Sequence, residues 1–230
     1  MANLQRLEVS IKYKVVLMET GLRERKKQKT REEIASAAMR LFRERGFDAV
    51  TVAEIADAAN VSVNTVYNYF PAKEDLFLDR AAGVVDRLSR WVRGRDAGES
   101  AAHAVLRELR REVEVVSPAV GLVEGYDRFM RVLHGAPALR SRMWGMQQQI
   151  QEHLEQTLRE ETGAPPADPL PALIAGQINW AHQTVMAAIG RAMADRRDPR
   201  EVSREVLVLL DDIEDLLSEK VLNYAVRGME

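Results

Sequence analysis

The chain has 230 residues, of which 33 are Lys or Arg and 35 are Asp or Glu, so its formal net charge is −2. This balance excludes a uniformly basic nucleic-acid-binding protein, and any basic surface must be local. Apolar residues make up 46 % of the chain, enough for a sizeable core, and no apolar run is long enough to cross a membrane. The absence of cysteine excludes disulfides and thiol chemistry, so we expect a cytoplasmic protein without membrane association.

Residues 1–20 differ from the remainder of the chain. Apolar residues from Val9 to Leu17 alternate in a rough strand period, but a lone strand without a partner is not stable. We therefore expect a disordered leader over 1–20, in which Met18 offers a second start. Two domains are expected to follow, over 21–71 and 72–230.

Three short helices are expected between Thr30 and Phe70. Capping-box pairs begin the first two, and Gly46 ends the first. Ser62 caps the third helix, and Pro71 ends it at Phe70. The capping-box pairs are Thr30 with Glu33 and Thr51 with Glu54.

Beyond Pro71 the apolar periodicity predicts six longer helices and no strand. They cover about 72–91, 101–116, 119–134, 137–161, 172–195 and 200–224. The fold class is therefore expected to be all-α, with about nine helices.

Residues 51–70 predict a helix, a tight turn and a second helix, which is the helix-turn-helix arrangement. Asn60 tolerates the left-handed backbone that the turn requires. Val66 and Phe70, four residues apart, are expected to face the core. The outward residues are then Asn64, Thr65 and Asn68, whose amides and hydroxyl suit hydrogen bonds to base edges.

The segment 23–31 holds six basic residues and one acid. Such a cluster neutralises DNA phosphates and releases counterions. A solvated charge run with no partner is the alternative.

Tyr67 and Tyr69 flank Asn68, and tyrosine hydroxyls commonly donate to phosphates, although one of the two can serve packing instead. Lys73 begins a predicted helix, where the helix dipole disfavours a cation unless a phosphate lies opposite. The alternative is a surface lysine balanced by Glu74 and Asp75.

Residues 27–77 resemble the N-terminal domain of TetR-family transcriptional regulators. The resemblance rests on the pattern T-V-x-x-I-A-x-A-A-x-V-S-x-x-T-V-Y-x-Y-F-P-x-K-E-D-L over residues 51–76. It implies an all-helical protein, with an N-terminal three-helix DNA-binding domain and a larger helical domain that binds a ligand and dimerises. Asn60 stands where the family often has glycine, and Val63 implies contact with a thymine methyl group.

The resemblance also implies roles for nine residues. Ser62, Val63, Asn64 and Thr65 would begin the recognition helix, with Val63 and Asn64 as the main base readers. The residues that would face phosphates are Thr51, Tyr67, Asn68, Tyr69 and Lys73.

The C-terminal half carries no diagnostic motif. Its last two predicted helices resemble the pair through which the family dimerises, and Leu209 and Leu216 lie on the apolar stripe of the second. Methionine and aromatic residues on the middle helices are candidates for an adaptable ligand pocket, or for solid core. The pocket candidates are Tyr126, Met130, Trp144, Gln147 and Trp180.

Enzyme motifs are missing from the sequence. Its four histidines stand apart, and no metal-binding, phosphate-binding or nucleophile pattern occurs. We therefore expect no enzyme, no metal and no cofactor. The expected function is that of a homodimeric repressor on double-stranded DNA, released from a palindromic operator by a small apolar or amphiphilic inducer. The alternative is a ligand-independent DNA-binding regulator or an activator.

Overall fold

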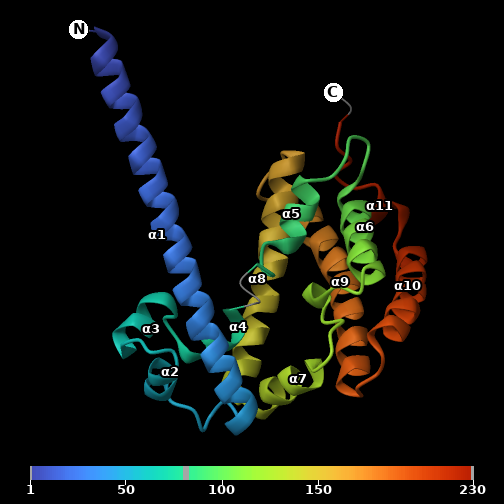
Figure 1. Cartoon of the computed structure of the whole chain (residues 1–230). Coiled ribbons are helices and arrows are strands. Elements are labelled where there is room, and N and C mark those ends of the chain that lie inside the picture. Colours follow the sequence, from blue (N-terminus) through green and yellow to red (C-terminus); the bar gives the residue numbers. More distant parts are fainter. Residues whose placement is uncertain (1, 80–82, 229–230) are drawn as a thin grey trace. The chain divides into compact units, whose positions relative to one another are not determined.

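The computed structural model describes residues 2–79 and 83–228, and for residues 2–23 it describes the backbone alone. Over these ranges the chain consists of helices and connecting segments without any strand, so the predicted all-α fold class is confirmed (Figure 1). The chain divides into two compact units between Asp79 and Arg80. None of the described helices is long and apolar enough to span a membrane.

The first unit contains four helices around a small aromatic core. Phe42 and Phe47 lie with ring centres 5.0 Å apart, and Phe77 lies 6.2 Å and 6.4 Å from these two rings. Helix α4 packs against α1 through the buried Leu76 and Phe77. The predicted boundary at residue 72 would assign this helix to the larger domain, whereas its packing places it in the first unit. The helices are α1 (Ala2–Arg45), α2 (Val52–Ala58), α3 (Val63–Tyr69) and α4 (Lys73–Leu78).

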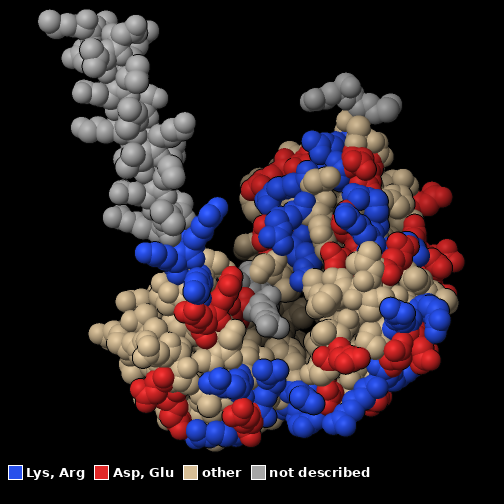
Figure 2. Space-filling view, viewed as in Figure 1, with Lys and Arg blue, Asp and Glu red and all other residues tan. Residues whose placement is uncertain are grey.

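Helix α1 begins earlier than expected. Its backbone is helical from Ala2, through the region expected to be a leader. Thr30 is not an N-cap, because it lies inside the helix and its hydroxyl donates to the carbonyl of Lys26 at 3.0 Å. The structure describes the side chains of α1 from Glu24 onward. Figure 2 shows Lys and Arg gathered around the helical turns that follow Glu24. The leader role of residues 1–20 stays a prediction.

The second unit is built around the helices α6, α8, α9 and α10, whose apolar faces form one core. Helices α8 and α9 follow each other through a short connection and pack side by side (Figure 1). Its elements are α5 (Arg87–Arg93), α6 (Ala101–Glu114), the 3-10 turn η2 (Pro118–Val120), α7 (Tyr126–Gly135), α8 (Pro137–Thr162), α9 (Leu170–Ala194), α10 (Pro199–Leu216) and α11 (Glu219–Leu222).

Three predicted helices are shorter than expected. The helix expected over 72–91 is divided, since α4 ends at Leu78, residues 83–86 form turns and α5 begins at Arg87. The helix expected from 119 begins only at Tyr126, because Gly121 adopts a left-handed φ of 91°. A Cβ on Gly121 would also lie 3.0 Å from the ring of Tyr126, so only glycine fits this turn.

The last predicted helix, over 200–224, breaks at Leu217. This residue is extended, with ψ of 132°, and its side chain is buried. Ser218 then begins α11 by accepting backbone hydrogen bonds from Val221 and Leu222. The break therefore coincides with the burial of Leu217, which the continuous apolar stripe of the sequence does not predict.

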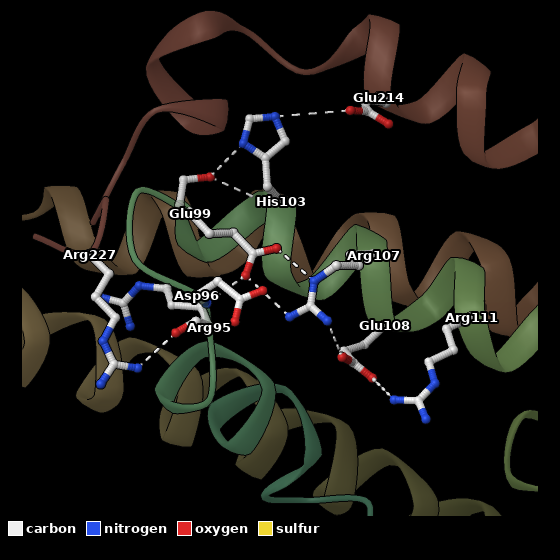
Figure 3. Close-up of polar contacts among 10 residues, drawn as sticks. Arg95, Asp96, Glu99, His103, Arg107, Glu108, Arg111, Glu214 and Arg227 are labelled. Carbon is white, nitrogen blue, oxygen red and sulfur yellow. Dashed lines mark hydrogen bonds and ion pairs between the residues drawn. The ribbon is translucent and has the colours of Figure 1, made fainter. Parts of the chain in front are cut away.

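Polar contacts connect the start of α6 to the C-terminal segment (Figure 3). Glu99 accepts two hydrogen bonds from Arg107, at 2.7 and 3.1 Å. Arg227 donates to the carbonyl of Arg95 at 2.7 Å, and its backbone N–H donates to the carbonyl of Glu99. The guanidinium of Arg95 is buried and lies 2.8 Å from Glu161. These contacts hold the end of the chain against the second unit.

Candidate nucleic-acid interface

Helix α3 is held in the first unit by its inward face. Val66 and Phe70 are buried, and the turn before the helix depends on Asn60, whose φ of 53° is left-handed as predicted. Ser62 is the N-cap, and its Oγ accepts from the backbone N–H of Thr65 at 3.0 Å. These contacts fix the helix so that its opposite face lies at the surface.

The outward face of α3 consists of Val63, Asn64, Tyr67 and Asn68, all of them exposed. Their spacing of one and four residues places them on one side of the helix. The helix contains no Lys, Arg, Asp or Glu, and Figure 2 shows an uncharged surface over it. Among the described residues none forms a hydrogen bond with the amides of Asn64 or Asn68. Both amides are therefore free to bond to an external partner.

Two of the predicted site residues, Thr51 and Ser62, serve as helix caps, and a third, Thr65, bonds to one of them. The hydroxyls of Ser62 and Thr65 share a hydrogen bond of 2.7 Å at the start of α3. The hydroxyl of Thr51 donates to Glu54 at 2.8 Å and accepts from its backbone N–H. Their hydroxyl groups are therefore engaged within the chain, while they set the direction of α2 and α3.

The capping box at α2 is reinforced by Arg45. This arginine donates to Glu54 at 2.7 Å, and the backbone N–H of Thr51 donates to the same carboxylate at 2.8 Å. The hydrogen bond from Thr51, followed by that from Arg45, lowers the pKa of Glu54 to about 2. The carboxylate is thus ionised at neutral pH and holds the end of α1 to the start of α2.

Tyr69 and Arg31 contribute to the packing of the first unit. Tyr69 is half-buried, and its carbonyl accepts from Arg31 at 3.2 Å. Arg31 also donates to Asp79 at 2.8 Å and lies over the ring of Phe70 at 4.6 Å. Tyr69 is therefore the packing member of the tyrosine pair, and Tyr67 is the exposed one.

Lys73 has partners within the chain, although the sequence predicts a phosphate opposite it. Its Nζ donates to the carbonyls of Phe47 and Val50, each at 2.8 Å, and lies 4.3 Å from the centre of the Phe47 ring. These groups satisfy the cation at the start of α4. The phosphate contact expected from the sequence stays a prediction, because these groups already account for a cation at this position.

The basic segment at the described start of α1 remains largely unpaired. Arg25, Lys26 and Lys27 are exposed, whereas Lys29 lies 3.8 Å from Glu33. The side chain of Arg23 lies outside the described residues. A compact group of exposed cations therefore stands on the same unit as the uncharged face of α3.

The predicted pocket residues of the second unit do not all face inward. Trp144 is 71 % exposed and Trp180 is 44 % exposed, so neither is enclosed as the sequence reading expected. Tyr126 is half-buried and stacks on Phe129 at 5.7 Å, and burial raises the pKa of its phenol. Met130 is also half-buried. Amphipathic periodicity does not distinguish a core-facing tryptophan from one on a second, outward apolar face.

Gln147, the fifth candidate, carries a buried oxygen without a hydrogen-bond partner in the described part of the chain. The structure adds two residues that sequence reasoning missed, Asn179 and His182, which are buried on the inward face of α9 with polar atoms that lack hydrogen-bond partners. The available signal was the spacing of an amide and an imidazole three residues apart on an otherwise apolar helix face.

Comparison with known proteins agrees with this geometry. Residues 34–79 match the family model described as "Bacterial regulatory proteins, tetR family". Residues 34–79 therefore form a TetR-family N-terminal domain. The match spans the end of α1 from Ile34 onward together with α2, α3 and α4, so the resemblance stated from the sequence is confirmed.

Curated relatives are named as helix-turn-helix transcriptional regulators and repressors. The regulator TcmR of Streptomyces glaucescens is 26 % identical over 148 residues, which cover 62 % of this chain and 65 % of TcmR. The repressor KstR2 of Mycobacterium tuberculosis is 35 % identical over 77 residues, which cover 34 % of this chain and 38 % of KstR2. The matched part thus spans less than two thirds of either relative.

Two solved structures of repressors share the fold over most of both chains. NalD, the secondary repressor of a multidrug efflux pump in Pseudomonas aeruginosa, superimposes with a TM-score of 0.54 at 23 % identity, over 80 % of this chain and 96 % of NalD. SmeT, the repressor of a Stenotrophomonas maltophilia efflux pump, does so with a TM-score of 0.52 at 17 % identity, over 87 % of this chain and 97 % of SmeT. At these identities the likeness concerns the fold alone.

Proposed function

We propose that this TetR-family protein is a DNA-binding transcriptional repressor. The observation that carries the proposal is the exposed face of α3, on which Asn64 and Asn68 present free amides. Asparagine can donate to and accept from adenine in the major groove, and an α-helix fits that groove. The exposed cations Arg25, Lys26 and Lys27 would add attraction to phosphates that does not depend on sequence.

The proposed operator is palindromic, because one α3 helix reads too few base pairs for specificity in a genome. A two-fold dimer would present two such helices about 34–36 Å apart, one turn of B-DNA. Helices α9 and α10 pack together and expose large apolar side chains, which supports them as the dimer surface. These side chains are Leu173, Trp180, Val208 and Leu216.

Selection from a random library of double-stranded DNA tests the proposal. We expect the full chain to enrich a palindrome, and we expect Asn64→Ala to weaken binding to it by about 1–3 kcal/mol while relaxing one base position. Gln149→Ala, an exposed amide on α8, serves as the matched control and should bind like the unaltered chain. Failure to enrich any sequence, with the helical content intact, would falsify the proposal.

Release by a small molecule completes the proposed function. A ligand that binds the second unit shifts DNA affinity only through its differential affinity for the DNA-bound and free states. A hundredfold release requires a coupling free energy of about 2.7 kcal/mol. Gel-shift titration of the selected operator, with and without the ligand, measures this coupling directly.

A further inference from the structure

Helix α9 carries two polar side chains into the core of the second unit. Asn179 is 2 % exposed and His182 is 3 % exposed. The Oδ1 of Asn179 and both ring nitrogens of His182 have no hydrogen-bond partner among the described residues. Since the two residues are three positions apart on a helix, their side chains are neighbours on one face.

Gln147 on α8 extends this group. The Nδ2 of Asn179 lies 3.5 Å from the Oε1 of Gln151, which places these two residues beside each other and leaves Oδ1 as the free atom. Helices α8 and α9 pack side by side and run in opposite directions (Figure 1). Gln147 lies one turn before Gln151, so it is level with the turn of α9 that holds His182. Its Oε1 is likewise buried and unpartnered.

The three side chains of this group are uncharged at neutral pH. Burial, with a smaller contribution from the positive charge of Arg87, lowers the pKa of His182 to about 4, so the imidazole is neutral at neutral pH. Arg87 itself donates to the carbonyl of Ala119 at 3.0 Å. Burial lowers the pKa of Arg87, and the charge of Glu112 opposes this shift. The polar atoms of Gln147, Asn179 and His182 thus carry no charge that a ligand would have to balance.

The unpartnered atoms define what a ligand must supply. The amide oxygens of Gln147 and Asn179 accept hydrogen bonds, and a neutral His182 offers one acceptor and one donor. Three acceptors and one donor match hydroxyl groups, which donate and also accept. A carboxylate or phosphate would face mostly acceptor atoms. The surrounding side chains are apolar, among them Ile150, Ile178 and Val185.

We propose that the face formed by Gln147, Asn179 and His182 binds an uncharged small molecule with an apolar body and at least two hydroxyl groups. A buried polar atom without a partner is costly, so three such residues on two packed helices are better explained by an external partner than by packing. That this molecule releases DNA rests on the proposed function, whereas its binding does not.

The test uses the full chain and two matched pairs of probes. Dihydroxynaphthalene and decanediol supply two hydroxyls on an aromatic and an aliphatic body, and their dimethyl ethers keep the body but cannot donate. We expect calorimetry to show binding of at least one diol, about tenfold or more tighter than its ether. Equal binding of diols and ethers, or no binding of either diol, would overturn the proposal.

Variants locate the site. Asn179→Leu and Gln147→Met each remove one acceptor at similar volume, and we expect the diol to bind about tenfold to a hundredfold more weakly. Gln149→Met removes an exposed amide from the same helix and should bind the diol like the unaltered chain. Unchanged affinity in both site variants, with their circular dichroism intact, places the ligand elsewhere and also overturns the proposal.

The comparison of diols with ethers needs no variant, so a variant that fails to fold leaves the test intact. Gel shifts on selected DNA, measured separately, distinguish the two proposals. Diol binding without DNA binding refutes the proposed function and keeps this site. DNA binding without diol binding refutes this site and favours the ligand-independent regulator.

Discussion

The side-chain nitrogen of Lys73 lies 2.8 Å from the carbonyl oxygen of Phe47 and 4.3 Å from the centre of the same residue's ring. One cation thus contacts both the backbone and the side chain of a residue in the connection between α1 and α2. A second bond, to the carbonyl of Val50, also lies in that connection. Lys73 therefore fastens the start of α4 to the segment that precedes α2 and α3.

We expect Lys73→Met to destabilise the first unit by about 1–3 kcal/mol, because two buried carbonyls lose a charged donor. Urea denaturation followed by circular dichroism measures the loss. Lys29→Met, on the exposed face of α1, is the control and should change stability little. Unaltered stability of Lys73→Met, together with a smaller salt dependence of DNA binding, would instead support the phosphate contact expected from the sequence.

The basic start of α1 predicts a specific salt dependence. Lys26→Gln and Lys27→Gln should each lower the slope of log affinity against log salt by about one, with no change in the preferred DNA sequence. Gel shifts at several salt concentrations give the slope. Arg31→Gln is an informative contrast, since Arg31 is bonded to Asp79 and should alter stability more than slope. An unchanged slope in both lysine variants excludes these phosphate contacts.

The apolar stripe of α10 separates into two roles. Leu216 is 74 % exposed, whereas Leu209 packs against the core of the second unit. We expect Leu216→Glu to give a folded monomer, and Leu209→Glu to lower the melting temperature, because only the second buries a charge. Light scattering and thermal melting distinguish the two. A dimer that persists in Leu216→Glu, or an unaltered chain that is monomeric at micromolar concentration, removes α10 from the dimer surface.

His182 predicts loss of stability in mild acid. Its pKa is lowered to about 4 in the folded chain, from 6.5 in its ordinary state. Below pH 6.5 the unfolded chain therefore binds a proton that the folded chain does not, so stability is complete above that pH and falls as the pH decreases toward 4. Thermal melting between pH 7 and pH 4 should show a steeper fall for the unaltered chain than for His182→Phe. Parallel curves would mean that folding does not lower the pKa of His182.

The residues whose roles could be predicted from the sequence contact groups that are close to them in the chain. Thr51, Ser62 and Asn60 begin or end helices through backbone groups within three residues, so their patterns are visible in the sequence. Val66 and Phe70 follow from helical spacing. The outward face of α3 then consists of the helix residues that do not face the core.

The residues whose contacts or exposure could not be predicted depend on parts of the chain that are distant in sequence. The partners of Lys73 are carbonyls more than twenty positions away, and carbonyls are common to every residue type. Trp144 and Trp180 lie on helices with more than one apolar face, and periodicity does not say which face is covered. The break at Leu217 coincides with tertiary burial of one side chain, which local helix preference does not predict.

In the proposed function, the two helices have separate tasks. The cationic start of α1 attracts the DNA phosphates, and the uncharged face of α3 discriminates between base sequences. Substitutions on α3 could then redirect the protein to another operator while its non-specific affinity for DNA stayed the same. Substitutions on α1 would adjust the time spent searching along DNA without altering the operator that is finally chosen. A lineage carrying this arrangement could acquire new target genes through a few changes at Val63, Asn64, Tyr67 and Asn68.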